Sequence, residues 1–320
     1  MPEAQSPSVN TAMSCARSFP NRILAAAGLF RPSRLIEKEF GNWRLVLRCE
    51  ISRLDKNKNM GEPMVSATTK VPIPPDDIES WNHKQRQYWD SVSEKYDSLY
   101  EDPWARKENG HIVDEMKWLA NEGVSSVLDL GCGTGLGAGF CKEIAPHIEY
   151  VGIDISKNMF QMAKNAHPEF KFHAADMADL RQFSDNTFDA VISLFSSFSH
   201  CMKPSAVLSE IKRVGKPGAR ILIAAMNGRS LDRIVARDTS DYDSIRMDIE
   251  DTLSAPARLY TRKSYHRMFV DAGFSDVHVT GLAIFANLME FAPLWPVDRM
   301  LSLMFPGLCD TLMAHGTCPE

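Results

Sequence analysis

The pattern of apolar and polar positions becomes regular from about residue 80 onward. Short apolar runs of strand length recur at residues 125–130, 150–153, 170–175, 188–194 and 220–225. Amphipathic segments separate these runs, and the stripe Val207, Leu208, Ile211 and Val214 falls on one face of a helix. Alternating buried strands and helices are typical of βαβ units. The pattern therefore predicts an α/β fold, with a doubly wound, mostly parallel sheet and helices on both faces.

The C-terminal part of the chain is less regular. Residues 265–272 predict a helix that ends at Gly273, and residues 277–280 predict one more strand. Residues 282–320 are apolar but interrupted by prolines. This last segment predicts an apolar helical tail, without a clear strand to close the sheet.

These patterns divide the chain into an extension at residues 1–70, a linker with cap helices at 71–100, the main α/β domain at 101–281 and the tail at 282–320. Within the domain, residues 227–262 predict an insertion that acts as a substrate lid. Three arginines in it could bind an anion, but we favour a solvated helix face. They are Arg229, Arg233 and Arg237.

The first 36 residues combine arginines with apolar and small residues and contain only one acid, Glu3. That composition is typical of an organellar transit segment, but an unstructured extension fits as well. We expect an intracellular protein, which is cytoplasmic, or organellar if residues 1–36 are a transit segment.

Composition and charge narrow the function classes. Of the 320 residues, 44% are hydrophobic and 24% are charged, which is typical of a globular protein. The formal net charge of −5 offers no general attraction for nucleic acid, so we expect no nucleic-acid partner. No apolar run reaches the roughly 18 residues that a transmembrane helix needs. The seven cysteines lack metal-binding spacing, so we expect no metal site. We expect the protein to be a monomer or a homodimer.

A glycine-rich turn follows the first predicted strand, in the sequence Asp129-Leu-Gly131-Cys132-Gly133-Thr-Gly135-Leu-Gly137. Glycines at a strand-to-helix turn allow the backbone to approach a ligand closely. Their spacing does not exclude a dinucleotide. The carboxylate of Asp129 would repel a pyrophosphate, however, and suits a ligand that carries an ammonium group.

The segment 127–135, VLDLGCGTG, resembles the first motif of class I S-adenosylmethionine-dependent methyltransferases. The likeness is to the small-molecule, ubiquinone/menaquinone-biosynthesis-like enzymes of the type 11 branch, and it extends over about residues 80–281. It implies a Rossmann-like seven-stranded sheet, S-adenosylmethionine as cofactor and S-adenosylhomocysteine as product. It also implies methyl transfer by in-line displacement to an O, N or C atom of a small molecule.

Two further functions remain open at this point. One is a nicotinamide-dependent oxidoreductase on a related sheet, and the other is a non-catalytic module that binds S-adenosylmethionine. Apolar residues near the C-terminus suggest a hydrophobic acceptor, although they could equally complete the core or a dimer contact. They are Phe285, Phe291, Leu294, Trp295 and Phe305.

Two acids after the Gly-rich turn are candidate cofactor ligands. Asp154 ends the second predicted strand, nineteen residues after Gly135, where doubly wound folds place an acid for the ribose hydroxyls. Asp176 follows the third strand, and the resemblance assigns it to the adenine amino group. The full set of predicted cofactor residues is Tyr88, Tyr96, Asp129, Gly131, Cys132, Gly133, Gly135, Asp154, Ile155, Met159, Asp176, Met177 and Leu194.

Two residues are candidates for proton transfer. His200 follows the fourth strand and titrates near neutrality when unperturbed, which suits a general base. Tyr96 lies in an aromatic-rich helix that, in the related enzymes, reaches over the cofactor. Both residues could instead serve only in packing.

Overall fold

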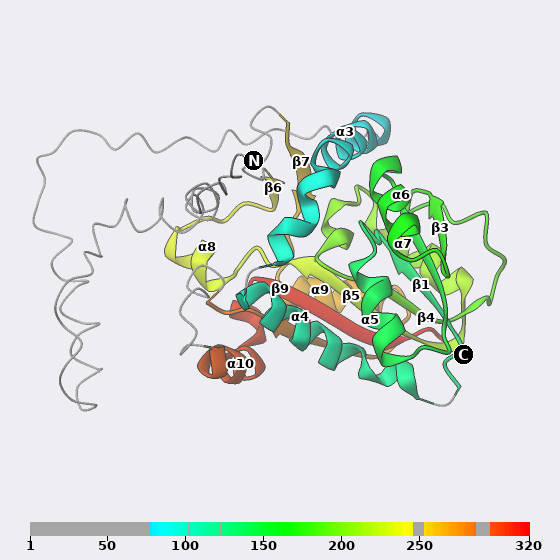
Figure 1. Ribbon diagram of the computed structural model, residues 1–320. Helices are drawn as coiled ribbons and strands as arrows, with labels where there is room; N and C mark the ends of the chain where they lie inside the picture. The colour runs from blue at the N-terminus through cyan, green and yellow to red at the C-terminus, as the bar shows by residue number, and fades with distance from the viewer. Residues whose placement is uncertain (1–76, 102, 122, 246–252, 286–294) are drawn as a thin grey trace, which may run out of the picture. The chain divides into compact units, whose positions relative to one another are not determined.

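The structure is a computed structural model that describes residues 77–101, 103–121, 123–245, 253–285 and 295–320 (Figure 1). All of them belong to one compact unit, residues 70–320. The predicted extension at residues 1–70, with its transit-like start, lies outside the described residues. So does the first part of the predicted linker.

The core is a seven-stranded sheet in the order β3-β2-β1-β4-β5-β9-β8. Every neighbouring pair from β3 to β5 is parallel, whereas β9 runs antiparallel to both of its neighbours. The doubly wound, mostly parallel sheet that the sequence predicts is therefore confirmed. The strands are β1 Ser126–Leu130, β2 Glu149–Asp154, β3 Lys171–Ala174, β4 Phe188–Ser193, β5 Gly215–Met226, β8 Ser275–Leu282 and β9 Thr311–Thr317.

Helices cover both faces of this sheet (Figure 1). The helices of the described residues are α3 Ile78–Tyr96, α4 Pro103–Met116, α5 Leu136–Ile144, α6 Lys157–Ala166, α7 Pro204–Val214, α8 Leu231–Val235, α9 Arg262–Asp271 and α10 Trp295–Met304. Short 3₁₀ turns add η1 Asp97–Tyr100, η2 Lys117–Ala120, η3 Ser197–His200 and η6 Pro306–Leu308.

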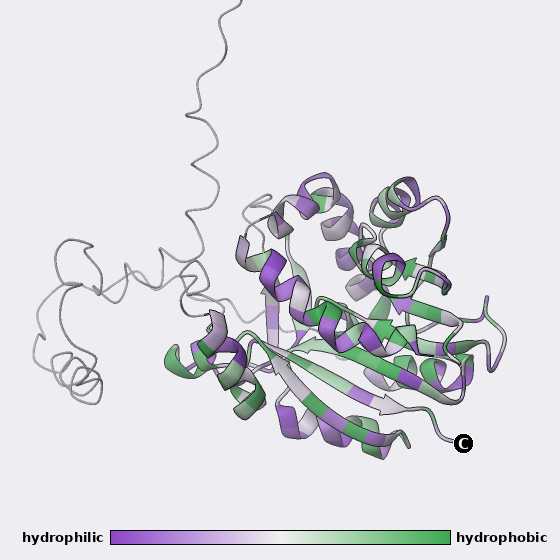
Figure 2. Ribbon diagram, turned by 60° about the horizontal axis from the view of Figure 1, so that its bottom comes forward, coloured by the Kyte–Doolittle hydropathy of each residue, from purple (hydrophilic) through white to green (hydrophobic). Residues whose placement is uncertain are grey.

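Alternate residues of the central strands face opposite cores. Leu128 packs with α7 and α9 on one face, and its neighbour Val127 packs with α4 and α5 on the other. Figure 2 shows the middle strands as hydrophobic bands between helices with hydrophilic outer surfaces. Because both faces are covered, the strands read as continuous apolar runs, and this is why the sequence pattern locates them well.

The C-terminal edge differs from the expectation. Residues 311–317 form β9, which inserts between β5 and β8 and pairs Ala314 with both Ile223 and Val279. The prediction of a tail without a clear final strand was therefore wrong. The predicted boundary between the domain and the tail, after residue 281, separates β9 from its partner β8. The segment contains Ala314, His315 and Gly316 where β-branched residues would have indicated a strand. The helical part of the predicted tail is present as α10.

The predicted insertion at 227–262 contains α8 and the antiparallel strands β6 Tyr242–Ile245 and β7 Ala255–Arg258. Arg233 donates hydrogen bonds to Asp238 and Asp243, and these acids balance its charge. An anion site at this arginine is therefore not supported. None of the described helices is long and apolar enough to span a bilayer.

Candidate functional site

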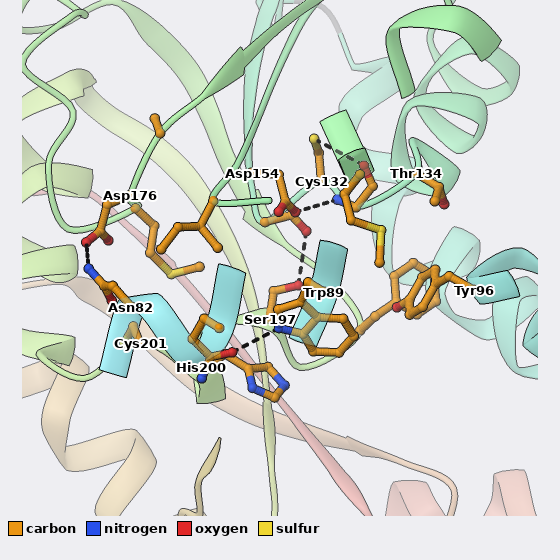
Figure 3. Close-up of a pocket in the computed structure, with 18 of the residues that line it drawn as sticks. Asn82, Trp89, Tyr96, Cys132, Thr134, Asp154, Asp176, Ser197, His200 and Cys201 are labelled. Carbon is orange, nitrogen blue, oxygen red and sulfur yellow. Dashed lines mark hydrogen bonds between the residues drawn. The ribbon is translucent and has the colours of Figure 1, made fainter. Parts of the chain in front are cut away.

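A cavity with about 830 Å³ of empty space, including its mouth, lies at the carboxyl ends of β1, β2 and β3, beneath α3 (Figure 3). Parallel sheets of this type bind ligands at this edge. Most of the predicted residues line the cavity: Tyr96, Gly131, Cys132, Gly133, Asp154, Ile155, Met159, Asp176, Met177 and His200.

The Gly-rich turn forms one wall of the cavity. Gly131 and Gly133 have φ angles of 76° and 55°, which disfavour residues with a Cβ atom. A Cβ atom at Gly131 would lie 2.6 Å from the Cβ atom of Ser197, so the turn and the loop after β4 fit together only with glycine. Gly135 also has a positive φ, but it packs against Ala163 and His167 and does not line the cavity.

Asp154 lies at the end of β2, with its side chain against the Gly-rich turn (Figure 3). Its Oδ2 accepts a hydrogen bond from Gly133 N at 2.9 Å, and its Oδ1 accepts one from Ser156 N at 2.8 Å. A carboxylate has about four acceptor positions, so two remain for ligand hydroxyls. Burial raises the pKa of Asp154 to about 6, despite these two backbone donors.

Asp176 follows β3 on the adjacent side of the cavity. Its Oδ1 accepts from Ala178 N at 2.9 Å, and its Oδ2 accepts from Asn82 Nδ2 at 2.6 Å. Both carboxylates therefore lie where the sequence predicts them, on neighbouring strand ends. Together they can accept hydrogen bonds from sugar hydroxyls and from an amino group.

Asp129 differs in position from the two cavity-lining carboxylates. Its side chain is buried behind the Gly-rich turn, is 2% exposed and is absent from the cavity wall. Oδ2 accepts a hydrogen bond from the Tyr150 hydroxyl at 2.6 Å, and Oδ1 has no partner among the described residues. Burial raises the pKa of Asp129 to about 7. Its geometry therefore supports a role beneath the turn, not a direct contact with a ligand.

Two more predicted contacts are displaced in the same way. Leu194 is buried against Gly137, and Phe195, which has a φ of 51°, lines the cavity instead. Tyr88 is fully buried among Val92, Met159 and Ala255 and does not line the cavity. Its helix position directs it toward the core, while Trp89 and Tyr96 face the cavity.

Sequence reasoning missed Asn82, Gln85 and Trp89, all of which line the cavity. They lie 14, 11 and 7 residues before Tyr96 in the sequence. These separations are multiples of a helical repeat, so one face of α3 carries all four residues. Counting back from Tyr96 in steps of a helical turn could have found them. Other missed lining residues are Thr134, Leu136, Ala175, Ser197 and Cys201.

His200 and Tyr96 both contact Trp89 in the cavity wall. The ring centroid of Trp89 lies 5.0 Å from that of His200 and 5.9 Å from that of Tyr96. His200 Nδ1 lies 3.3 Å from the Pro256 carbonyl oxygen. Burial lowers the pKa of His200 to about 4, so its ring is neutral near pH 7. The Tyr96 hydroxyl lies 2.8 Å from that of Tyr100, and burial raises the pKa of Tyr96 to about 12.

Comparison with known proteins agrees with this geometry. Residues 128–223 match the family described as a methyltransferase domain. The ubiquinone/menaquinone biosynthesis C-methyltransferase UbiE of Desulfotalea psychrophila is 36% identical over 180 residues, 49% of this chain and 68% of that protein. The demethylmenaquinone methyltransferase of Thermotoga maritima is 30% identical over 167 residues, 50% of this chain and 69% of that protein. The chain spans about half the length of several other curated relatives, 52% to 59% of each.

A solved structure shows the same fold. Phosphoethanolamine N-methyltransferase 2 of Haemonchus contortus, in complex with S-adenosyl-L-methionine, superposes with a TM-score of 0.53 at 18% identity, over 78% of this chain and 62% of that one. The glycine turn and the two cavity-lining carboxylates fit the adenosine part of S-adenosylmethionine. Neither the oxidoreductase nor the non-catalytic alternative finds support among these relatives. The chain belongs to the class I S-adenosylmethionine-dependent methyltransferases of the ubiquinone/menaquinone-biosynthesis type.

Proposed function

We propose that the chain transfers the methyl group of S-adenosylmethionine to a nucleophilic atom of a small, apolar, ring-containing molecule. One observation carries this proposal. A single cavity is lined both by the carboxylates Asp154 and Asp176 and by the aromatic rings of Trp89, Tyr96 and Phe195. The carboxylates suit an adenosyl group and the aromatic rings suit an apolar acceptor.

The two carboxylates would hold the cofactor through its sugar and base. Asp154 would accept hydrogen bonds from the ribose hydroxyls, and Asp176 would accept one from the adenine amino group. Ile155, Met159 and Met177 line the cavity beside these acids and offer apolar surface to the adenine ring. The bound cofactor would supply an electrophilic methyl group, while the chain positions the reactants and excludes water.

His200 and Tyr96, on either side of Trp89, supply hydrogen bonds without strong acid or base catalysis. If Nδ1–H of His200 donates to the Pro256 carbonyl oxygen, Nε2 is an acceptor that can orient a hydroxyl group of the acceptor molecule. With a pKa near 4, His200 is a weak base. Tyr96 keeps its proton at neutral pH because its pKa is about 12. Alignment of the two reactants can account for roughly 7 to 11 kcal/mol of the barrier, so no stronger base is required.

The acceptor class rests on the cavity wall and on the names of the relatives. UbiE of Desulfotalea psychrophila is a C-methyltransferase of ubiquinone and menaquinone biosynthesis, and this supports an apolar aromatic acceptor here. The apolar C-terminal wall that the sequence suggests does not contribute to this cavity. Phe285, Trp295 and Phe305 are absent from the cavity wall, and Phe291 and Leu294 lie outside the described residues.

Methyl transfer from radiolabelled S-adenosylmethionine tests the proposal directly. We expect labelled product with prenylated or unsubstituted hydroquinones and little with small hydrophilic amines. A His200→Gln variant, whose amide still offers an acceptor, should keep most of the activity, and His200→Leu should lose most of it. Labelling of hydrophilic amines alone would contradict the acceptor class. A failure to bind S-adenosylhomocysteine in calorimetry would contradict the function itself.

A further inference from the structure

Three polar side chains of α3 and its C-terminal end each contact a different loop of the cofactor site. Asn82 Nδ2 donates to Asp176 Oδ2 after β3, at 2.6 Å. Asp90 Oδ1 accepts from the Ser156 hydroxyl after β2, at 2.5 Å. Asp97 Oδ1, in η1, accepts from the Thr134 hydroxyl after β1, at 2.5 Å. Each of the three loops that carry cofactor residues therefore has its own polar contact with this segment.

The spacing of these residues matches the order of the strands. Asn82, Asp90 and Asp97 are separated by eight and seven residues, or about two helical turns each, so they lie along one side of the helix. The loops that they contact follow β3, β2 and β1, which are consecutive in the sheet. The helix thus crosses the strand ends in sheet order, as Figure 1 shows for α3 above the ends of the strands.

Other contacts fix the helix from a second direction. Gln85 donates to the Pro256 carbonyl oxygen and Trp81 donates to the His200 carbonyl oxygen, each at 2.6 Å. Both side chains are 2% exposed. These buried contacts hold α3 against β7 and η3, so the polar contacts with the three loops have a fixed support.

The contact of Asn82 also determines what Asp176 can bind. Ala178 N and Asn82 Nδ2 each occupy one acceptor position of the carboxylate, and the remaining positions can only accept. A purine with an amino group at position 6 can donate to them. A purine with a carbonyl oxygen at that position would place two acceptors against each other.

We propose that Asn82, Asp90 and Asp97 are positioning residues of the cofactor site, and that Asn82 also sets its selectivity for adenosine over inosine. This inference rests on the proposed function, because it assumes that Asp176 faces the purine. Asn82 orients the carboxylate that reads the base. Asp90 and Asp97 hold the loops after β2 and β1, which contact the sugar and the methionine portion.

Calorimetry with S-adenosylhomocysteine and S-inosylhomocysteine, on the full chain, tests the assignment. We expect Asn82→Ala to bind S-adenosylhomocysteine about tenfold more weakly and to lose most of its preference over the inosine analogue. We expect Asp90→Ala to weaken both ligands about tenfold and to leave the preference unchanged. Asp90→Asn should restore affinity to within about threefold, because its amide oxygen can still accept from Ser156. Gln87→Ala, the loss of an exposed amide on the same helix, should change neither quantity.

Each outcome decides the question. If Asn82→Ala binds both ligands as the wild type does, or weakens both equally, the selectivity role is wrong. If Asp90→Asn is as weak as Asp90→Ala, the hydrogen bond to Ser156 does not position the loop. Should Asn82→Ala fail to fold, Asn82→Asp replaces it. That variant places two carboxylates in contact, so its affinity relative to wild type at the same pH should recover as the pH falls, and an unchanging ratio would overturn the role. A wild type that binds neither ligand would refute the proposed function.

Discussion

Asp129 belongs to the motif that identifies the family, but its replacement by Asn should show a stability effect that depends on pH. The free energy of unfolding of Asp129→Asn, relative to that of wild type, should increase as the pH rises. The Asn side chain has nearly the same shape, and its oxygen can still accept from the Tyr150 hydroxyl. Its amide nitrogen replaces Oδ1, which has no partner among the described residues, and this costs about 1 to 3 kcal/mol at every pH. The change therefore removes one ionisable group and adds a constant penalty.

The pH dependence follows from the two pKa values. Burial raises the pKa of Asp129 from its ordinary 3.8 to about 7 in the folded chain. Between these values the folded state binds a proton that the unfolded state has released, so the folded wild type loses stability as the pH rises. The loss approaches about 1.4 kcal/mol per pH unit and amounts to about 3 kcal/mol between pH 5 and pH 8. Above about pH 7 the loss levels off.

Denaturant unfolding of wild type and Asp129→Asn at pH 5, 6, 7 and 8 measures this difference. Glu108 titrates in both proteins, and its contribution cancels in the comparison. The contribution of Asp154 cancels only in part, because its charge also raises the pKa of Asp129. We expect the stability of the variant relative to wild type to increase by about 3 kcal/mol across the series. A difference that stays constant with pH would refute the reasoning. Calorimetry on the same variant should show S-adenosylhomocysteine affinity within about threefold of wild type, since Asp129 does not line the cavity.

Three further predictions follow from the site and the sheet. S-adenosylhomocysteine should bind about tenfold more weakly at pH 5 than at pH 7, because protonation of Asp154 below its pKa of about 6 removes hydrogen-bond acceptors. In calorimetry, Asp154→Asn should abolish this pH dependence of the affinity. Gly131→Ala should lower cofactor affinity at least tenfold because its Cβ atom meets Ser197, whereas Gly110→Ala, with nothing within 4 Å, should bind normally. Ala314→Asp, at a fully buried position of β9, should cost several kcal/mol in denaturant unfolding.

The parts of the fold that the sequence predicts well are those with local signals. β1, β2, β4 and β5 are buried on both faces and appear in the sequence as apolar runs between turn residues. Asp154 and Asp176 were found because strand ends of a parallel sheet meet at one edge. For these two residues, the position along the chain determines the position in space.

The parts that could not be predicted depend on contacts between distant segments. β9 lacks β-branched residues along most of its length and is a strand because β5 and β8 pair with it on both sides. Asp129 has the motif position of a ligand contact, but Tyr150, 21 residues away, donates a buried hydrogen bond to it. The choice between Tyr88 and Trp89 depends on how α3 is rotated, and an aromatic-rich stripe alone does not determine that rotation.

The distribution of charge around the cavity separates the two cofactors that the glycine spacing leaves open. Asp154 and Asp176 line the cavity, Asp129 lies just behind it, and no lysine or arginine lines it in the described part of the chain. Burial disfavours the ionised forms of Asp129 and Asp154, and a nearby cation would favour them. A pyrophosphate would add negative charge beside these acids, whereas a sulfonium with an ammonium group adds positive charge. The electrostatics of the site therefore favour S-adenosylmethionine over a dinucleotide on grounds independent of the sequence motif.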